Sequence, residues 1–319
     1  MRRVVHALDA ALIFMIICIS QPVSAADPLG ETPLGNRAAI IFDSDRTGTT
    51  EIFIIESEGL VPTSVTSASP QVFNRLPDWS PDCAMVAFQS NRADEDNRDI
   101  YVAASDGSGV RRITTHIASD ESPAWSPDGS EIAFASDRGD GEAIWIVDSD
   151  GNTVRRLTTG SPQSFQPAWS PDGKTIAFVS GSEENWDLFV IRTDGSEIRN
   201  LTNTPNRHEG GPAWSPNGRR ILFDALEGGQ WEIYVMAADG SDERQLTRNG
   251  AMDARPAWSA DGSEIVFHST RDFGSDGDNV DYSQVELYVM RADGSDVHRL
   301  TQNEYFDAHP DWCLDMANP

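Results

Sequence analysis

Short runs of alternating apolar and polar residues, separated by turns rich in glycine and proline, follow one another along most of this chain. Residues 131–136 place apolar side chains at alternate positions, and a second β-rich run follows at 143–147. A side-chain period of two is typical of strands with one buried face. Asp150-Gly151 is a hairpin dipeptide, and residues 154–158 complete the unit as a short fourth strand. No segment sustains a helical period, so the pattern predicts an all-β fold.

The unit recurs behind a phrase centred on one tryptophan, which reads Ser-Pro-Ala-Trp-Ser-Pro-Asp-Gly at residues 122–129. The intervals between successive copies are 46, 44, 45, 44 and 54 residues. A period of about 40 to 50 residues is typical of small sheets that must stack on their neighbours, and a closed ring of such sheets is a propeller. The six copies are centred on Trp79, Trp125, Trp169, Trp214, Trp258 and Trp312.

The two ends of the repeat array are incomplete in complementary ways. Residues 39–44 begin at the second strand of a unit, and the chain ends soon after Trp312, which belongs to a first strand. Pairing this C-terminal inner strand with the N-terminal strands completes a sixth blade and leaves no free sheet edge. We therefore expect a six-bladed β-propeller over residues 39–319.

The phrase Pro-x-Trp-Ser-Pro-Asp-Gly-x-x-Ile-Ala-Phe-x-Ser-x-Arg, with a later Ile-Tyr-Val, Asp-Gly and Leu-Thr, resembles the WD40-like (PD40) repeat of TolB-type six-bladed propellers. The resemblance covers residues 39–312 and implies a periplasmic interaction module. TolB carries an α/β domain ahead of its propeller. Only residues 26–38 separate the leader from the ring here, so that domain is expected to be missing.

The first 25 residues read as a signal peptide. Arg2 and Arg3 precede an apolar run over residues 10–20, and Val23-Ser24-Ala25 offers small residues for cleavage. Residues 26–38 would form a linker, and no other stretch is apolar enough for stable membrane insertion. The formal net charge of −27 makes nucleic acid a poor partner. We expect a periplasmic or secreted protein, with a monomer favoured.

Comparing the six copies with one another separates scaffold from candidate chemistry. The tryptophans are expected in the core, as are the phenylalanines nine places after the first five and Phe42 in the split blade, and the Asp-Gly pairs are expected in turns. Five places before each tryptophan lie Asn74, Asp120, Ser164, Glu209, Asp253 and Asp307. Thirteen places after the first five lie Arg92, Arg138, Ser182, Glu227 and Arg271, and Arg46 holds the equivalent position in the split blade. In three blades an acidic residue faces an arginine. This arrangement favours ion pairs that connect loops, rather than a functional rim of carboxylates.

One blade departs from this rule, because Glu209 and Glu227 lack the arginine while Arg207 and His208 stand beside them. Two unpaired carboxylates with a histidine would bind a cation or a ligand amine, and solvation of a lone surface histidine is the alternative. Arg255 and His309, each directly before a proline, are expected at the same channel mouth. The candidate partner-binding residues are His208, Glu209, Glu227, Asp253, Arg255, Asp307 and His309.

The long interval before Trp312 contains an insertion that is dense in oxygen ligands: Asp272, Asp276, Asp278, Asn279 and Asp281. Calcium takes about six to eight oxygens, so the segment is either a calcium loop or a solvated acidic loop, and the second interpretation is favoured. No other cofactor is predicted. Cys83 and Cys313 replace repeat residues in neighbouring blades, and in an oxidising compartment a disulfide between them would lock the ring.

These observations favour an exported, non-catalytic propeller that binds a protein or peptide through its loop-rich face and central channel. The chain has no Gly-x-Ser-x-Gly nucleophile motif. The alternative is a propeller enzyme, a metal-dependent carbohydrate lyase or lactone hydrolase, with His208, Glu209, Asp253 and His309 converging on a metal.

Overall fold

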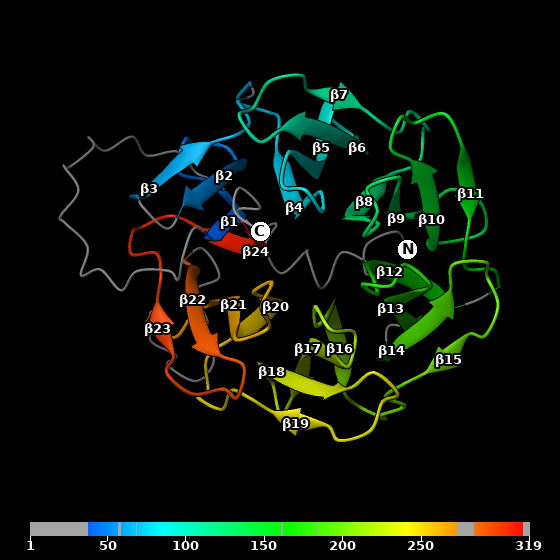
Figure 1. The fold of residues 1–319 in the computed structure, drawn as a ribbon. Coiled ribbons are helices and arrows are strands. Elements are labelled where there is room, and N and C mark those ends of the chain that lie inside the picture. Colours follow the sequence, from blue (N-terminus) through cyan, green and yellow to red (C-terminus); the bar gives the residue numbers. More distant parts are fainter. Residues whose placement is uncertain are drawn as a thin grey trace.

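The described residues form six four-stranded antiparallel sheets arranged as the blades of a closed ring (Figure 1). The computed structural model describes residues 38–56, 59–67, 69–160, 162–182, 184–272 and 284–314. The predicted signal peptide and nearly all of the predicted linker lie outside these ranges. The described residues contain no helix long and apolar enough to cross a membrane.

The first three blades follow the chain from its N-terminal strands. Blade 1 contains β24 (Asp307–Leu314), β1 (Ala38–Ser44), β2 (Glu51–Glu56) and β3 (Gly59–Ser64). Blade 2 contains β4 (Asn74–Trp79), β5 (Met85–Asp94), β6 (Asn97–Ala104) and β7 (Arg111–Arg112). Blade 3 contains β8 (Asp120–Trp125), β9 (Glu131–Ser136), β10 (Ala143–Asp148) and β11 (Val154–Arg156).

The remaining three blades repeat the same order, with the tryptophan strand innermost. Blade 4 contains β12 (Gln163–Trp169), β13 (Thr175–Ser182), β14 (Asn185–Arg192) and β15 (Arg199–Asn200). Blade 5 contains β16 (His208–Trp214), β17 (Arg220–Glu227), β18 (Gln230–Ala237) and β19 (Arg244–Gln245). Blade 6 contains β20 (Asp253–Trp258), β21 (Glu264–Ser269), β22 (Glu286–Arg291) and β23 (His298–Arg299).

Blade 1 closes the ring as the sequence predicts. Strand β24 pairs antiparallel with β1, with Trp312 opposite Ile40 and Cys313 opposite Ala39. Cys313 also forms a disulfide with Cys83 of blade 2, and their Cα atoms are 6.1 Å apart. Two connections therefore join the C-terminal strand to the N-terminal half of the ring, one through the sheet and one covalent.

The predicted core phenylalanines are fully buried, and each belongs to the second strand of its blade. They are Phe42, Phe88, Phe134, Phe178, Phe223 and Phe267. An aromatic residue lies directly opposite each of them on the third strand, as in the pair Phe223–Tyr234, whose ring centroids are 5.5 Å apart. The tryptophans fit the prediction only in part. Trp79, Trp258 and Trp312 are buried, whereas the other three are half-buried.

Every inner strand contains a β-bulge three residues before its tryptophan. The residue there has a left-handed backbone, with φ between 50° and 53°, in all six blades: Leu76, Ser122, Gln166, Gly211, Arg255 and His309. A proline follows each of them. Non-glycine residues adopt this conformation rarely, and bulges re-aim the strand that contains them. All six bulge residues line the central cavity described next.

Candidate functional site

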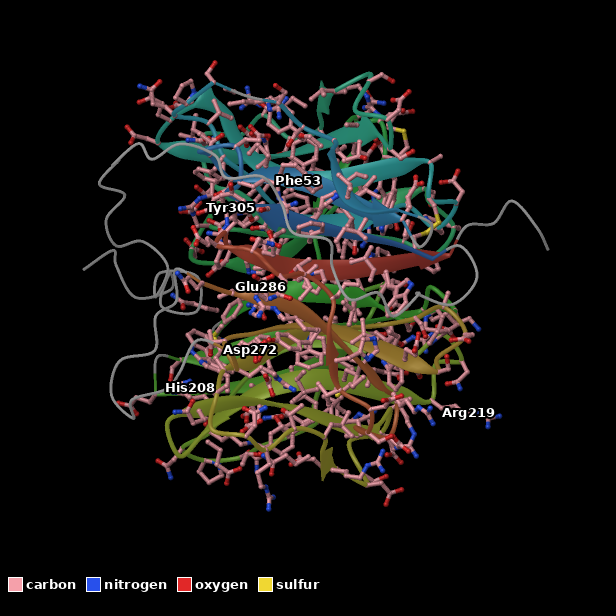
Figure 2. All side chains as sticks on the ribbon, turned by 90° about the vertical axis from the view of Figure 1, so that its left-hand side faces the viewer. Phe53, His208, Arg219, Asp272, Glu286 and Tyr305 are labelled. Atoms are coloured by element: carbon pink, nitrogen blue, oxygen red, sulfur yellow. A yellow bond between two sulfur atoms is a disulfide. The ribbon has the colours of Figure 1, made fainter. Side chains whose placement is uncertain are left out.

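The ring has two different faces. Figure 2 shows His208, Asp272 and Tyr305 on one side, near the loops that lead into the inner strands, and Arg219 on the other. We call these the loop face and the turn face, because Arg219 belongs to the turn that follows Trp214. The inner strands run from the loop face at Asn74 or Asp120 to the turn face at their tryptophans.

A central cavity of about 440 Å³ is enclosed by the inner strands. Its lining runs from the bulge residue of each blade to the tryptophan, and in four blades it includes the proline or alanine two places later, as in Leu76 to Pro81. The cavity therefore occupies the half of the channel nearer the turn face. Tryptophan and proline supply much of its wall, and polar groups lie between them, a combination that is found in ligand sites.

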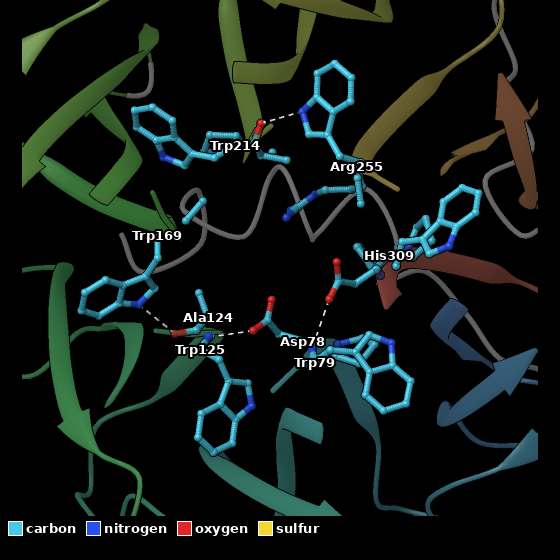
Figure 3. A pocket seen from close by; sticks show the side chains of 18 of the residues that line it. Asp78, Trp79, Ala124, Trp125, Trp169, Trp214, Arg255 and His309 are labelled. Carbon is cyan, nitrogen blue, oxygen red and sulfur yellow. Dashed lines mark hydrogen bonds between the residues drawn. The ribbon is translucent and has the colours of Figure 1, made fainter. Parts of the chain in front are cut away.

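Four charged or titratable residues interrupt this apolar wall: Asp78, Arg255, His309 and Asp311. In Figure 3 the side chain of Arg255 extends into the channel, and the carboxylate of Asp78 faces the same space. Asp78 Oδ2 accepts the backbone N–H of Trp125 at 2.7 Å, and Asp311 Oδ2 accepts that of Trp79 at 3.1 Å. Each carboxylate thus joins its own blade to the next one.

The bulge residues are held by side chains from the neighbouring blade. The N–H of Arg255 donates to Asp224 Oδ2 at 2.7 Å, and the N–H of Ser122 donates to Gln89 Oε1 at 3.0 Å. The N–H of His309 donates to His268 Nδ1 at 3.1 Å. His268 is fully enclosed, and burial holds its pKa well below the usual range, so its ring remains neutral and available as an acceptor.

The ring of His309 lies against the same group of buried side chains. Its Nδ1 atom is 2.8 Å from Asp43 Oδ1, and its ring centroid is 5.4 Å from that of His268 in an edge-to-face arrangement. Arg75 contacts the other oxygen of Asp43 at 3.5 Å. These contacts connect blade 1 to both of its neighbours, through Arg75 of blade 2 and His268 of blade 6.

Comparison with known proteins identifies the family of this chain. The sequence model of the TolB β-propeller domain matches residues 61–230 and 205–283. The chain belongs to the TolB β-propeller family. No match was found among curated protein sequences.

Solved structures share this TolB-like fold at low identity. A putative TolB from Agrobacterium tumefaciens is 24% identical, with a TM-score of 0.64 over 87% of this chain and 98% of that one. TolB from Acinetobacter baumannii is 20% identical, with a TM-score of 0.70 over 86% of this chain and 66% of that one. An oligogalacturonate lyase in complex with manganese is 16% identical, with a TM-score of 0.56 over 82% of this chain and 73% of that one.

On the loop face of this TolB-like ring, the predicted ion pairs between loops are confirmed. Arg46 lies 2.7 Å from Asp307, Arg138 lies 2.5 Å from Asp120, and Arg271 lies 2.8 Å from Asp253. Arg92 makes the equivalent bond to the neutral Asn74 at 2.7 Å. In blade 4, where both charges are absent, Ser164 bonds Ser180 at 3.2 Å instead of Ser182.

The prediction of unpaired carboxylates in blade 5 is wrong. Arg207 lies 2.6 Å from the fully buried Glu209, and its other nitrogens bind Glu243. Burial raises the pKa of Glu209 to about 7, although Arg207 acts in the opposite direction. Glu227 accepts a hydrogen bond from the Tyr234 hydroxyl at 3.0 Å. Arg207 thus occupies the place of the missing arginine, and it reaches Glu209 from two residues away along the chain.

The seven candidate binding residues do not meet at one mouth. Glu209, Asp253 and Asp307 are buried in loop contacts, and His208 lies on the loop face. Arg255 and His309 line the cavity towards the opposite face. The expected convergence fails because the bulge turns residues three places before the tryptophan into the channel, whereas residues five places before it face neighbouring loops.

The acidic insertion is described only at Asp272, whose carboxylate accepts the Tyr288 hydroxyl at 2.5 Å and lies 3.0 Å from Arg299. Asp276, Asp278, Asn279 and Asp281 lie outside the described residues. Within the described ranges, no group of three or more His, Cys, Asp or Glu side chains is placed to hold a metal ion.

Sequence reasoning missed the two cavity carboxylates. The position before the tryptophan is Ala124, Ala168, Ala213 and Ala257 in four blades, but aspartate at 78 and 311. Aligning the repeats at this position would have revealed the departure. It would not have shown that these side chains face the channel, because that orientation depends on the bulge.

Proposed function

We propose that this chain is an exported, non-catalytic propeller that binds a protein or peptide partner in its central channel and on the surrounding face. The observation that supports this proposal is the cavity itself, about 440 Å³ in volume, with tryptophan and proline walls and a few fixed charges. Such a lining suits an extended segment that presents both apolar and charged side chains. The signal-like leader supports export, to the periplasm or beyond the cell.

A photo-crosslinking experiment tests the site. Benzoylphenylalanine would replace Ser122, which lines the cavity, or Ile198, which is 59% exposed and outside it. We expect a discrete protein adduct from position 122 in cells that export the chain, and none from position 198. The further substitution Ala168→Trp, which fills part of the cavity, should abolish the adduct. Equal adducts from both positions, or an adduct that Ala168→Trp leaves unchanged, would refute the channel as the binding site.

The alternative is a metal-dependent lyase or lactone hydrolase acting in the channel. It requires stoichiometric transition metal in the purified protein and turnover of an oligouronide or a lactone that Ala168→Trp abolishes. Metal analysis together with these two assays separates an enzyme from a binding module. Metal-dependent turnover would overturn the non-catalytic proposal, whereas bound calcium alone would not.

A further inference from the structure

The two cavity carboxylates form a pair on neighbouring inner strands. Asp311 belongs to β24 and Asp78 to β4, and these strands are in contact in blades 1 and 2. The other four blades have alanine at the same position. The negative charge is therefore confined to one sector of the channel wall, next to the strand that closes the ring.

Each carboxylate is fixed in place by its hydrogen bond to a backbone N–H. Within the described part of the chain, neither carboxylate forms an ion pair with a basic side chain. His309, two residues before Asp311, directs its ring to Asp43. The fold thus holds two acidic groups side by side with no ion pair to either among the described residues, and Arg255 is a basic side chain that lines the same cavity.

The surroundings make this arrangement costly when the site is empty. Burial, and then repulsion by Asp311, raise the pKa of Asp78, and burial raises the pKa of Asp311 to about 6. A cationic group between the two carboxylates would offset both effects, because opposite charges attract strongly between low-dielectric walls.

We propose that Asp78 and Asp311 recognise a basic side chain, so that the channel selects a partner segment presenting lysine or arginine. This inference rests on the proposed channel binding and names the chemistry that the channel prefers. The apolar walls would receive the methylene groups of the same side chain. The overall charge of −27 would favour the approach of a basic segment from a distance.

Indole N–H signals of tryptophan in protein labelled with nitrogen-15 provide the test, because six of the nine tryptophans line the cavity. The probes are N-acetyl-lysine methylamide and its neutral analogue N-acetyl-norleucine methylamide. We expect the lysine probe to shift channel indole signals and to bind at least about tenfold more tightly than the norleucine probe. Equal binding, or no binding by either probe, would overturn the inference.

Matched variants separate local recognition from general attraction. The double variant Asp78→Asn with Asp311→Asn keeps an oxygen that can accept each backbone N–H. It should bind the lysine and norleucine probes with about equal affinity, since both charges are lost. Glu95→Gln with Glu184→Gln removes the same net charge from exposed positions and should preserve the preference. Equal losses in both double variants would overturn the inference. If the double asparagine variant fails to give a dispersed spectrum, Asp78→Asn alone should still reduce the preference.

The crosslinking experiment distinguishes this inference from the proposed function. An adduct at position 122 that forms without any lysine preference would refute cation recognition alone. Loss of both the adduct at position 122 and the preference for the lysine probe would refute channel binding as well.

Discussion

Arg138→Ala should destabilise the protein far more than removal of a surface arginine. Arg138 Nη2 lies 2.6 Å and 2.5 Å from the two oxygens of Asp120, and Nε lies 2.9 Å from Ser136 Oγ. Asp120 is fully buried. Removing one partner of a buried pair leaves an uncompensated charge and costs about 3–5 kcal/mol. The guanidinium also stacks 5.0 Å from the Trp145 ring centroid, which adds to the loss.

Blade 4 provides a natural reference for this prediction. Serine replaces both charged residues there, at 164 and 182, and the blade keeps its four strands. The double substitution Asp120→Ser with Arg138→Ser copies that blade and leaves no buried charge. We therefore expect the double variant to be more stable than Arg138→Ala, because the desolvation cost of Asp120 is removed.

The surface pair Arg155–Glu131 serves as the control. Its atoms are 3.1 Å apart, but the two side chains are 39% and 34% exposed, so Arg155→Ala should cost less than about 1 kcal/mol. Urea unfolding followed by tryptophan fluorescence and circular dichroism would measure all three variants with the disulfide intact. A loss below about 1 kcal/mol for Arg138→Ala, or a double variant less stable than the single one, would refute the reasoning.

Two further predictions concern the seam and the pH dependence. The disulfide closes a sequence separation of 230 residues, so reduction should lower the free energy of unfolding by up to about 5 kcal/mol in urea titrations. A Cys83→Ser, Cys313→Ser variant should not respond to reductant, and an unchanged wild-type midpoint would contradict the prediction. Because the pKa of Glu209 is raised to about 7, the folded state binds protons that the unfolded state does not. Stability should therefore fall by about 1 kcal/mol between pH 6.5 and 8.5, and Glu209→Gln should flatten this slope in thermal unfolding scans.

The repeat pattern was sufficient to predict the ring, because its determinants are local and occur six times. The alternation of apolar residues, the Asp-Gly turns and the phenylalanine nine places after each tryptophan define one blade. The ion pairs were predictable for the same reason, since Asp120 and Arg138 keep a fixed spacing across blades. Closure by β24 followed from the incomplete units at the two ends.

The orientation of the channel residues was not predictable from spacing alone. A regular strand would place residues three and five before the tryptophan on the same side. The bulge at residues such as Leu76 and Arg255 breaks this alternation. The N–H of each of these two residues is held by a side chain of the preceding blade, Asp43 or Asp224, so the geometry depends on tertiary packing.

The cavity carboxylates and the disulfide cysteines, which depart from the repeat, lie around the seam, and this placement links binding to closure. Asp311, His309 and Cys313 all lie on β24, while Asp78 and Cys83 lie in blade 2. The carboxylates proposed to recognise a basic side chain are also the acceptors that join blade 1 to blade 2 and blade 2 to blade 3. A cation bound between the two carboxylates would stabilise their ionised form, which is the form that accepts hydrogen bonds from these backbone N–H groups best. Occupation of the channel would therefore reinforce the junction at which the ring closes.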